Sequence, residues 1–184
     1  MKNSKTIKLN SKKIIEIRKS LDAEITKSFK IIRSENVMSK KEKNAGCGSG
    51  CDLKALYNHI TQLQQKRIKI KGMLMYLNIG QTSFNFEEFM KTNNYHIFAA
   101  CEAKEAITQL KMIPTLNPQE KAKKGKSNMN KTETFTSAKI ASLLKDLQLD
   151  ANKHDAAMES FNSGTDITIS DAKEYDDFIT YLTA

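Results

Sequence analysis

The sequence predicts an all-α protein: an antiparallel helical hairpin or three-helix bundle over residues 11–116, followed by a small, mostly helical C-terminal subdomain over residues 135–184. Apolar residues recur at steps of three and four along most of the chain, which is the spacing of one helix face. Only two of the 184 residues are Pro, so few positions are expected to interrupt a helix. Hydrophobic residues make up 39% of the chain, enough for a folded core.

The first predicted helix covers residues 12–33. It follows residues 1–10, a polar stretch that we expect to be a flexible lead-in. The apolar residues of the helix share one face, which is expected to turn toward the core: Ile14, Ile17, Leu21, Ile25, Phe29 and Ile32. Residues 34–52 lose this periodicity and are rich in Ser, Lys, Asn and Gly, so they are predicted to form a loop.

The second predicted helix, over residues 53–78, carries the longest periodic stripe, and Asp52 is expected to cap its N-terminus. The stripe consists of Leu53, Leu56, Ile60, Leu63, Arg67, Ile70, Leu74 and Leu77. Such a heptad-like stripe is typical of a helix that packs along its length on another helix, as in a coiled coil. We therefore take six of these residues as candidate interaction residues: Leu56, Ile60, Leu63, Arg67, Ile70 and Leu74.

Arg67 is the one charged residue on this stripe. Its charge could fix the register of the helix or select its partner. Alternatively, its aliphatic stem packs on the stripe while the guanidinium reaches water, as long basic side chains commonly do. We favour the second interpretation.

The third predicted helix covers residues 86–113. Gly80 is expected to end the second helix, and Asn85 to cap the third, with Glu88 in the capping-box position. Because the connection between the two helices is short, they are predicted to be antiparallel neighbours. Two adjacent poor helix formers, Asn93 and Asn94, could break the third helix.

One face of the third helix is predicted to be buried by the same spacing: Phe86, Phe89, Ile97, Ala100, Ile107 and Leu110. Four small residues are expected to let a neighbouring helix approach closely: Ala99, Ala100, Ala103 and Ala106. Pro114 is expected to end the helix.

Residues 117–134 lack an apolar period and are predicted to be a basic linker. Their lysines are candidate contacts for nucleic acid: Lys121, Lys123, Lys124, Lys126 and Lys131. A solvated loop kept soluble by its lysines would have the same composition.

Residues 135–184 are predicted to form an acidic subdomain. Ser137 is expected to cap a first helix over residues 138–149, and a second short helix is expected over about 152–161. The residues NSGT then predict a turn, residues 166–169 a short strand, and residues 171–182 a last helix.

Cys47 and Cys51, in the stretch NAGCGSGC, are spaced like two ligands of a zinc ion. A structural zinc site usually has two such pairs, and the second could come only from His59, His96 or Cys101. His96 and Cys101 point about 140° apart on a helix, so they would not converge. We therefore predict no metal and no cofactor, and treat Cys101 as a small buried residue.

The net charge of +9 is unevenly distributed. Residues 1–150 contain 28 Lys and Arg against 14 Asp and Glu, a balance of +14, whereas residues 151–184 contain 2 against 7, a balance of −5. A basic body with an acidic end suggests a polyanionic partner or an internal electrostatic match. Only three of the thirty basic residues are Arg, the residue best suited to read base edges, so sequence-specific recognition of DNA is not expected.

We expect a non-enzymatic helical assembly or adaptor protein that binds a protein partner or copies of itself. The sequence has no phosphate-binding glycine loop and no recognisable catalytic constellation. It has no apolar run that could span a membrane and no signal peptide, so we expect a cytoplasmic protein. The abundance of Lys and Asn would suit a structural or accessory component of a phage or mobile element, in which case the protein would be located in the virion. The alternative is a non-specific nucleic-acid-binding protein with a Lys-rich surface.

Overall fold

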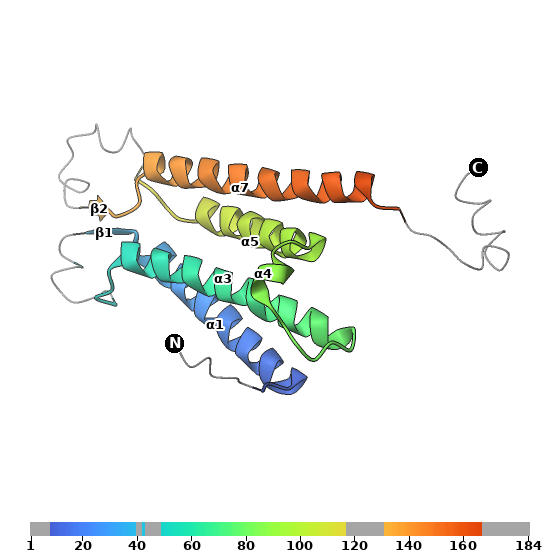
Figure 1. The fold of residues 1–184 in the computed structure, drawn as a ribbon. Coiled ribbons are helices and arrows are strands. Elements are labelled where there is room, and N and C mark those ends of the chain that lie inside the picture. Colours follow the sequence, from blue (N-terminus) through green and yellow to red (C-terminus); the bar gives the residue numbers. More distant parts are fainter. Residues whose placement is uncertain (1–7, 40–41, 43–48, 117–130, 167–184) are drawn as a thin grey trace, which may run out of the picture.

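The computed structural model describes residues 8–39, 42, 49–116 and 131–166, and they are mostly helical (Figure 1). The elements are α1 (Ser11–Glu35), β1 (Val37–Ser39), α3 (Leu53–Asn78), α4 (Phe86–Phe89), α5 (Asn93–Lys111), β2 (Lys131–Glu133) and α7 (Ser137–Gly164). The helical bundle predicted from the sequence is confirmed. In the described part of the chain, no helix is both long and apolar enough to cross a membrane.

The bundle consists of two helix pairs. Helix α1 packs along α3, and α5 packs along α7, while α3 and α5 join the two pairs in the middle (Figure 1). The predicted stripes hold the first pair together. The stripe of α1 is buried at Ile14, Leu21, Ile25, Phe29 and Ile32, and that of α3 at Leu53, Ile60, Leu63 and Ile70.

The predicted capping residues mark the ends of α3 and the start of α4. The Asp52 carboxylate accepts hydrogen bonds from the backbone at the start of α3. Gly80, with a φ of 78°, lets the chain leave the end of α3, where the Gln81 N–H donates to the Tyr76 carbonyl at 2.9 Å. Asn85 caps α4, as predicted.

The helix predicted over residues 86–113 is two helices in the structure. Helix α4 ends at Phe89, and α5 begins at Asn93, directly after the break. The side chain of Thr92 accepts a hydrogen bond from the Tyr95 N–H and caps α5. The break therefore lies immediately before the two asparagines.

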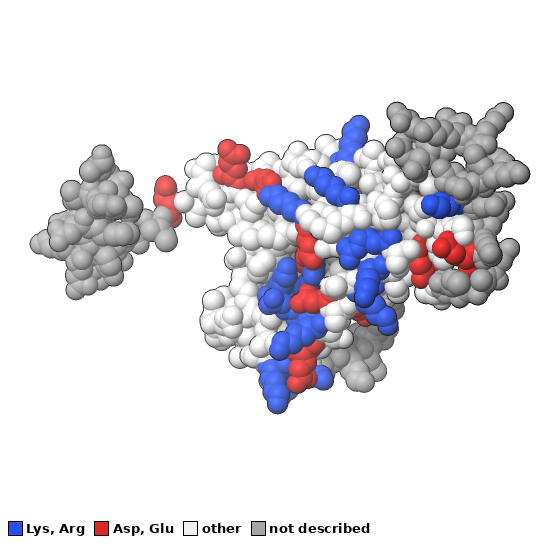
Figure 2. All heavy atoms as spheres, turned by 180° about the vertical axis from the view of Figure 1, so that it is seen from behind, with Lys and Arg blue, Asp and Glu red and all other residues white. Residues whose placement is uncertain are grey.

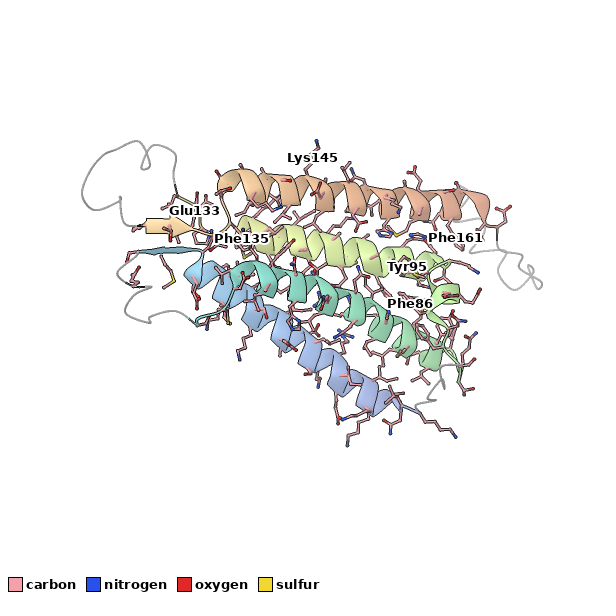
Figure 3. All side chains as sticks on the ribbon, turned by 60° about the vertical axis from the view of Figure 1, so that its left-hand side comes forward. Phe86, Tyr95, Glu133, Phe135, Lys145 and Phe161 are labelled. Carbon is pink, nitrogen blue, oxygen red and sulfur yellow. The ribbon has the colours of Figure 1, made fainter. Side chains whose placement is uncertain are left out.

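The short helix α4 carries the centre of an aromatic cluster. Phe89 is fully buried, and the rings of Tyr76, Phe84, Phe86, Tyr95 and Phe98 surround it. Gly72 of α3 lies directly under this ring, because a Cβ at Gly72 would be 2.7 Å from Phe89 Cε1. Figure 3 shows Phe86 and Tyr95 at the end of the bundle opposite to the strands.

The predicted loop and linker contribute a small antiparallel sheet, which corrects the expectation that both lack structure. Val37 pairs with Glu133, and Ser39 with Lys131. The buried Asn36 fixes this junction: its amide donates to the carbonyls of Pro114 and Phe135 at 2.7 and 2.9 Å, and its Oδ1 accepts from the Phe135 N–H at 2.6 Å.

The prediction of two short helices over residues 137–161 is wrong. Helix α7 is one continuous helix that runs into the predicted NSGT turn and ends at Gly164. Its cap is Thr136 rather than Ser137: the Thr136 hydroxyl accepts from the Lys139 N–H at 3.1 Å. Packing on α5 explains the continuity, since Ala151 and His154, at the predicted junction, are both buried. The predicted helix over residues 171–182 lies outside the described residues, as does the predicted strand apart from Asp166.

Helix α7 also shares the main core. Ile140 of α7 and Phe135, just before the helix, belong to the same buried cluster as the stripes of α1 and α3. The rings of Phe135 and Tyr57 on α3 pack edge to face, with their centres 5.8 Å apart. Figure 3 shows Phe135 between β2 and α7, at the strand end of the bundle. The described helix of the C-terminal segment is thus packed onto the helices that precede it.

Two burial predictions on α5 are wrong. Ile97 is 37% exposed, and Cys101 is also exposed. Ile107 and Leu110 are buried as predicted, and the four small residues of α5 are buried with them: Ala99, Ala100, Ala103 and Ala106. These alanines allow the close approach of a neighbouring helix that the sequence predicted.

Candidate functional site

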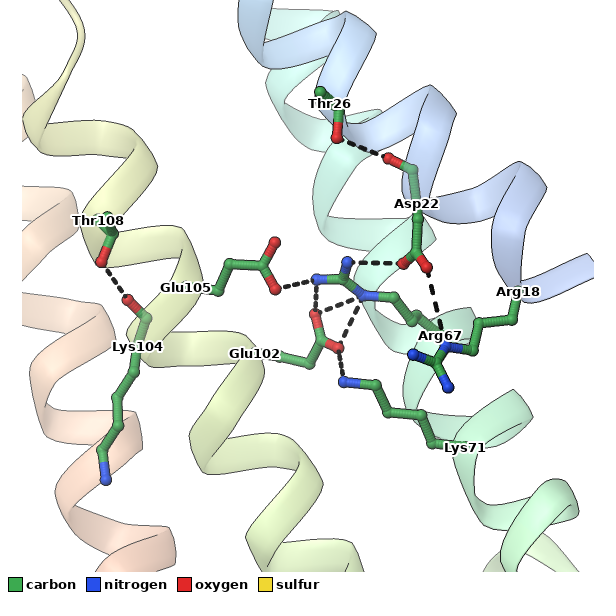
Figure 4. Close-up of polar contacts among 9 residues, drawn as sticks. All are labelled: Arg18, Asp22, Thr26, Arg67, Lys71, Glu102, Lys104, Glu105 and Thr108. Carbon is green, nitrogen blue, oxygen red and sulfur yellow. Dashed lines mark hydrogen bonds and ion pairs between the residues drawn. The ribbon is translucent and has the colours of Figure 1, made fainter. Parts of the chain in front are cut away.

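Arg67 lies buried where α1, α3 and α5 meet (Figure 4). Only 6% of its side chain is exposed, so the interpretation that its guanidinium reaches water is wrong. Two neighbouring helices direct carboxylates at it, and these compensate the buried charge.

The guanidinium donates hydrogen bonds to three carboxylates. Its Nε donates to both Glu102 oxygens at 2.8 and 3.0 Å, and its Nη2 donates to Glu102 as well. Its Nη1 donates to Asp22 on α1 at 2.9 Å, and its Nη2 to Glu105 on α5 at 2.6 Å. Lys71 donates to the Glu102 Oε1 at 2.8 Å. We call these five residues the Arg67 network.

The electrostatics of the network are dominated by Arg67 and Glu102, which are both almost fully buried, whereas the carboxylates of Asp22 and Glu105 remain 40% and 44% exposed. Burial alone would lower the pKa of the Arg67 guanidinium, but the hydrogen bonds that it donates to Glu102 and Asp22 outweigh this effect and raise that pKa above its ordinary value. Arg67 therefore stays charged and links α3 to both α1 and α5 through its hydrogen bonds.

The second polar cluster is a pair of histidines between α5 and α7. The Nδ1 atoms of His96 and His154 are 2.9 Å apart, and His154 is 7% exposed. On the other side of the His154 ring, Nε2 lies 3.7 Å from the Asp150 carboxylate. The Tyr95 ring meets both imidazoles edge-on.

Burial lowers the pKa of His154. The nearby carboxylates of Asp150 and Asp155 oppose this shift, while His96 and Lys153 add to it. His154 also lines a cavity of about 160 Å³ between α3, α5 and α7. From the sequence, His96 is a candidate only as a metal ligand, and nothing in the sequence pattern marks His154 as its partner.

A groove of about 730 Å³ lies between the start of α1, the second half of α3 and residues 81–84. Its apolar lining consists of Leu9, Ile14, Met73, Tyr76, Leu77 and Phe84. Lys8 is the only charged residue in the lining. The groove is therefore mainly apolar and has a single positive charge in its lining.

The predicted interaction stripe is occupied within the chain. Leu56, Ile60, Leu63, Ile70 and Leu74 all belong to the main core or pack against it. Their partner is α1, so these side chains are not free to bind another molecule while α1 is in place.

The cysteine and histidine ligands considered in the sequence do not come together in the described residues. Cys51 is exposed, and Cys47 lies outside the described residues. His59 pairs with Glu24 at 2.7 Å, His96 pairs with His154, and Cys101 faces solvent. No group of three or more potential metal ligands occurs in the described ranges.

Of the candidate nucleic-acid contacts, only Lys131 lies in the described part of the chain, where it is exposed at the start of β2. Lys121, Lys123, Lys124 and Lys126 lie outside it. Figure 2 shows Lys and Arg side chains interleaved with Asp and Glu side chains across one face of the bundle. The positive charges on this face are thus partly compensated by neighbouring negative ones.

No family model, curated protein or solved structure matches the chain.

Proposed function

We propose that the protein is a non-enzymatic helical assembly or adaptor protein that binds a protein partner through helix–helix contacts. The composition further suggests a structural or accessory component of a phage or mobile element. The observation that supports the proposal is the groove between α1, α3 and residues 81–84, which has six apolar lining residues and a volume of about 730 Å³. Apolar grooves between helices commonly receive an amphipathic helix from another protein.

The lining indicates the chemistry of the partner. Its polar members, Gln81, Thr82 and Ser83, can form hydrogen bonds, and its single charge, on Lys8, is positive. The matching partner segment is an amphipathic helix with apolar residues on one face and a carboxylate beside them. This replaces the stripe of α3 as the predicted contact surface, since α1 already covers that stripe.

The test compares two substitutions of exposed leucines. Leu9→Asp places a charge in the groove, where Leu9 is 38% exposed, and the matched Leu149→Asp places one on α7, where Leu149 is 59% exposed. A partner is first identified by pull-down from the native source and is then titrated against each variant. We expect Leu9→Asp to weaken binding at least about tenfold and Leu149→Asp to leave it unchanged.

Two results would overturn the proposal. One is a partner that binds the Leu9→Asp variant as tightly as the wild-type protein. The other is an inert monomer in analytical ultracentrifugation, alone and with every protein recovered from the source.

Non-specific nucleic-acid binding is the second candidate, because the chain has a net charge of +9. It predicts binding of a labelled oligonucleotide that weakens steeply as salt rises and depends little on base sequence. The interleaved carboxylates seen in Figure 2 weigh against it. A titration without binding at low salt excludes this candidate.

A further inference from the structure

The two imidazoles between α5 and α7 share a hydrogen bond that has room for one proton. Their Nδ1 atoms are 2.9 Å apart, and their ring centres are 5.2 Å apart. These two distances place both nitrogens close to the line between the rings, which is the arrangement of a hydrogen bond. One ring must donate an N–H and the other must accept it with a lone pair.

The same geometry disfavours a metal ion between the rings. A metal would need both nitrogen lone pairs to converge on a point beside that line, with further ligands around it. Here the two nitrogens face each other directly, and the described residues supply no third ligand. The pair is therefore suited to a proton rather than to a metal.

The ionisable groups around the pair come from both helices. They are Tyr95, Glu102 and Lys104 on α5, and Asp150, Lys153 and Asp155 on α7. Helix α3, on the remaining side, contributes the uncharged Thr61, Gln64, Gln65 and Ile68 to the neighbouring cavity.

Most of the negative charge near the pair is already engaged. Glu102 binds Arg67, and Asp155 binds Lys104 at 2.8 Å. Asp150 is the carboxylate nearest to His154, but it is 56% exposed and 3.7 Å away, so solvent screens its charge. Two imidazolium ions 2.9 Å apart would therefore repel each other with little local compensation.

We propose that the His96–His154 pair makes the packing of α7 on α5 sensitive to acid, because the packed helices hold the pair with one proton less than the separated helices. This inference does not depend on the function proposed above. Separation would expose the inner face of α7, including Ile140, Leu147 and Ala151, together with the alanine face of α5.

The direction of the effect follows from His154. Its pKa is lowered from 6.5 when α7 is packed and returns toward that value when α7 separates. Packing is therefore fully stabilised above about pH 6.5 and is weakened as the pH falls, because the separated form takes up an additional proton. Because one proton is taken up, the opening equilibrium rises as the pH falls from 6.5 toward the lowered pKa of His154, by at most about tenfold for each pH unit.

Hydrogen exchange followed by mass spectrometry on the full chain tests this inference. Exchange is measured between pH 7.5 and 5.0 and corrected for the intrinsic pH dependence of amide exchange. We expect peptides of α7 and α5 to lose protection progressively as the pH falls below 6.5, by at most about tenfold per pH unit, while peptides of α1 and α3 change little.

Three substitutions make the test specific. His154→Gln and His96→Gln each remove one imidazole and leave a side chain that can form a hydrogen bond, so both are expected to lose most of the acid dependence. His59→Gln is the matched control, because His59 pairs with Glu24 on the other side of the bundle and should leave the dependence unchanged.

The inference is overturned if the wild-type α7 peptides show no acid dependence, or if the His96→Gln variant retains the wild-type dependence. His96 is only half-buried, so its variant is expected to fold even if replacement of the more buried His154 does not.

Discussion

Replacing Arg67 with Met tests whether the buried charge fixes the helices. The substitution keeps an unbranched chain of similar length and removes the guanidinium. Glu102, whose side chain is 5% exposed, would then lose its main partner inside the bundle. Removing one member of a buried ion pair costs about 3–5 kcal/mol, because the other charge stays buried.

The structure places the expected cost at the lower end of this range. Lys71 still donates to Glu102 at 2.8 Å and would neutralise part of its charge. Asp22 and Glu105 are 40% and 44% exposed, so water can hydrate them once Arg67 is gone. We therefore expect Arg67→Met to lower the free energy of unfolding by about 3 kcal/mol.

The assay is urea unfolding followed by far-UV circular dichroism at neutral pH. With an ordinary dependence on urea, a loss of about 3 kcal/mol shifts the midpoint by about 1–2 M. Arg18→Met is the matched control, because Arg18 lies 3.8 Å from Asp22 in an exposed ion pair. We expect that control to cost less than about 1 kcal/mol.

A double substitution separates the charge from the packing. Arg67→Met combined with Glu102→Leu removes both buried charges and should restore stability to within about 1 kcal/mol of the wild-type protein. If Arg67→Met costs no more than Arg18→Met, the guanidinium is not held as the structure shows, and the reasoning is refuted.

Three further predictions concern packing, the sheet junction and the cysteines. Gly72→Ala would favour the helix by about 1 kcal/mol, but the new Cβ would clash with the buried Phe89 ring, so we expect a net loss of about 1–2 kcal/mol in the free energy of unfolding, measured in the same assay. Gly164→Ala is the control: nothing lies within 4 Å of a Cβ at that position, so we expect it to be near neutral. Asn36→Ala leaves the buried polar groups of the sheet junction without its hydrogen bonds and should cost about 2–4 kcal/mol; a change below 1 kcal/mol would contradict this. Cys101 is exposed, so after treatment with a thiol reagent in native buffer, peptide mapping by mass spectrometry should show the adduct on the peptide that contains Cys101. Labelling of that peptide only after denaturation would contradict the exposure.

The stripes of α1 and α3 could be predicted from the sequence because each is periodic by itself. The spacing identified the buried residues of α1, and the capping residues Asp52 and Asn85 marked where helices begin. Both features are local: they depend on residues that are close in sequence and need no knowledge of the partner helix.

The Arg67 network could not be predicted in this way, because it depends on what faces Arg67 across the bundle. The position of Arg67 on the stripe of α3 fits a guanidinium that reaches water as well as one that binds a carboxylate. One signal was present in α5, where Glu102 interrupts a face of alanines. A carboxylate among small buried residues requires a positive partner, and Arg67 was the only charged residue on the longest apolar stripe.

Helix α7 shows how tertiary contacts override a local preference. The stretch LDANKHD is polar and rich in weak helix formers, which favoured a break between two short helices. In the structure, Ala151 and His154 of this stretch face α5, where alanines allow the helices to approach closely and His96 meets His154. These contacts stabilise the helical conformation where its propensity is weakest. The same two contacts place the paired imidazoles at the middle of α7. The part of the helix that depends most on α5 for its helical conformation is therefore also the part whose packing we propose to be sensitive to acid.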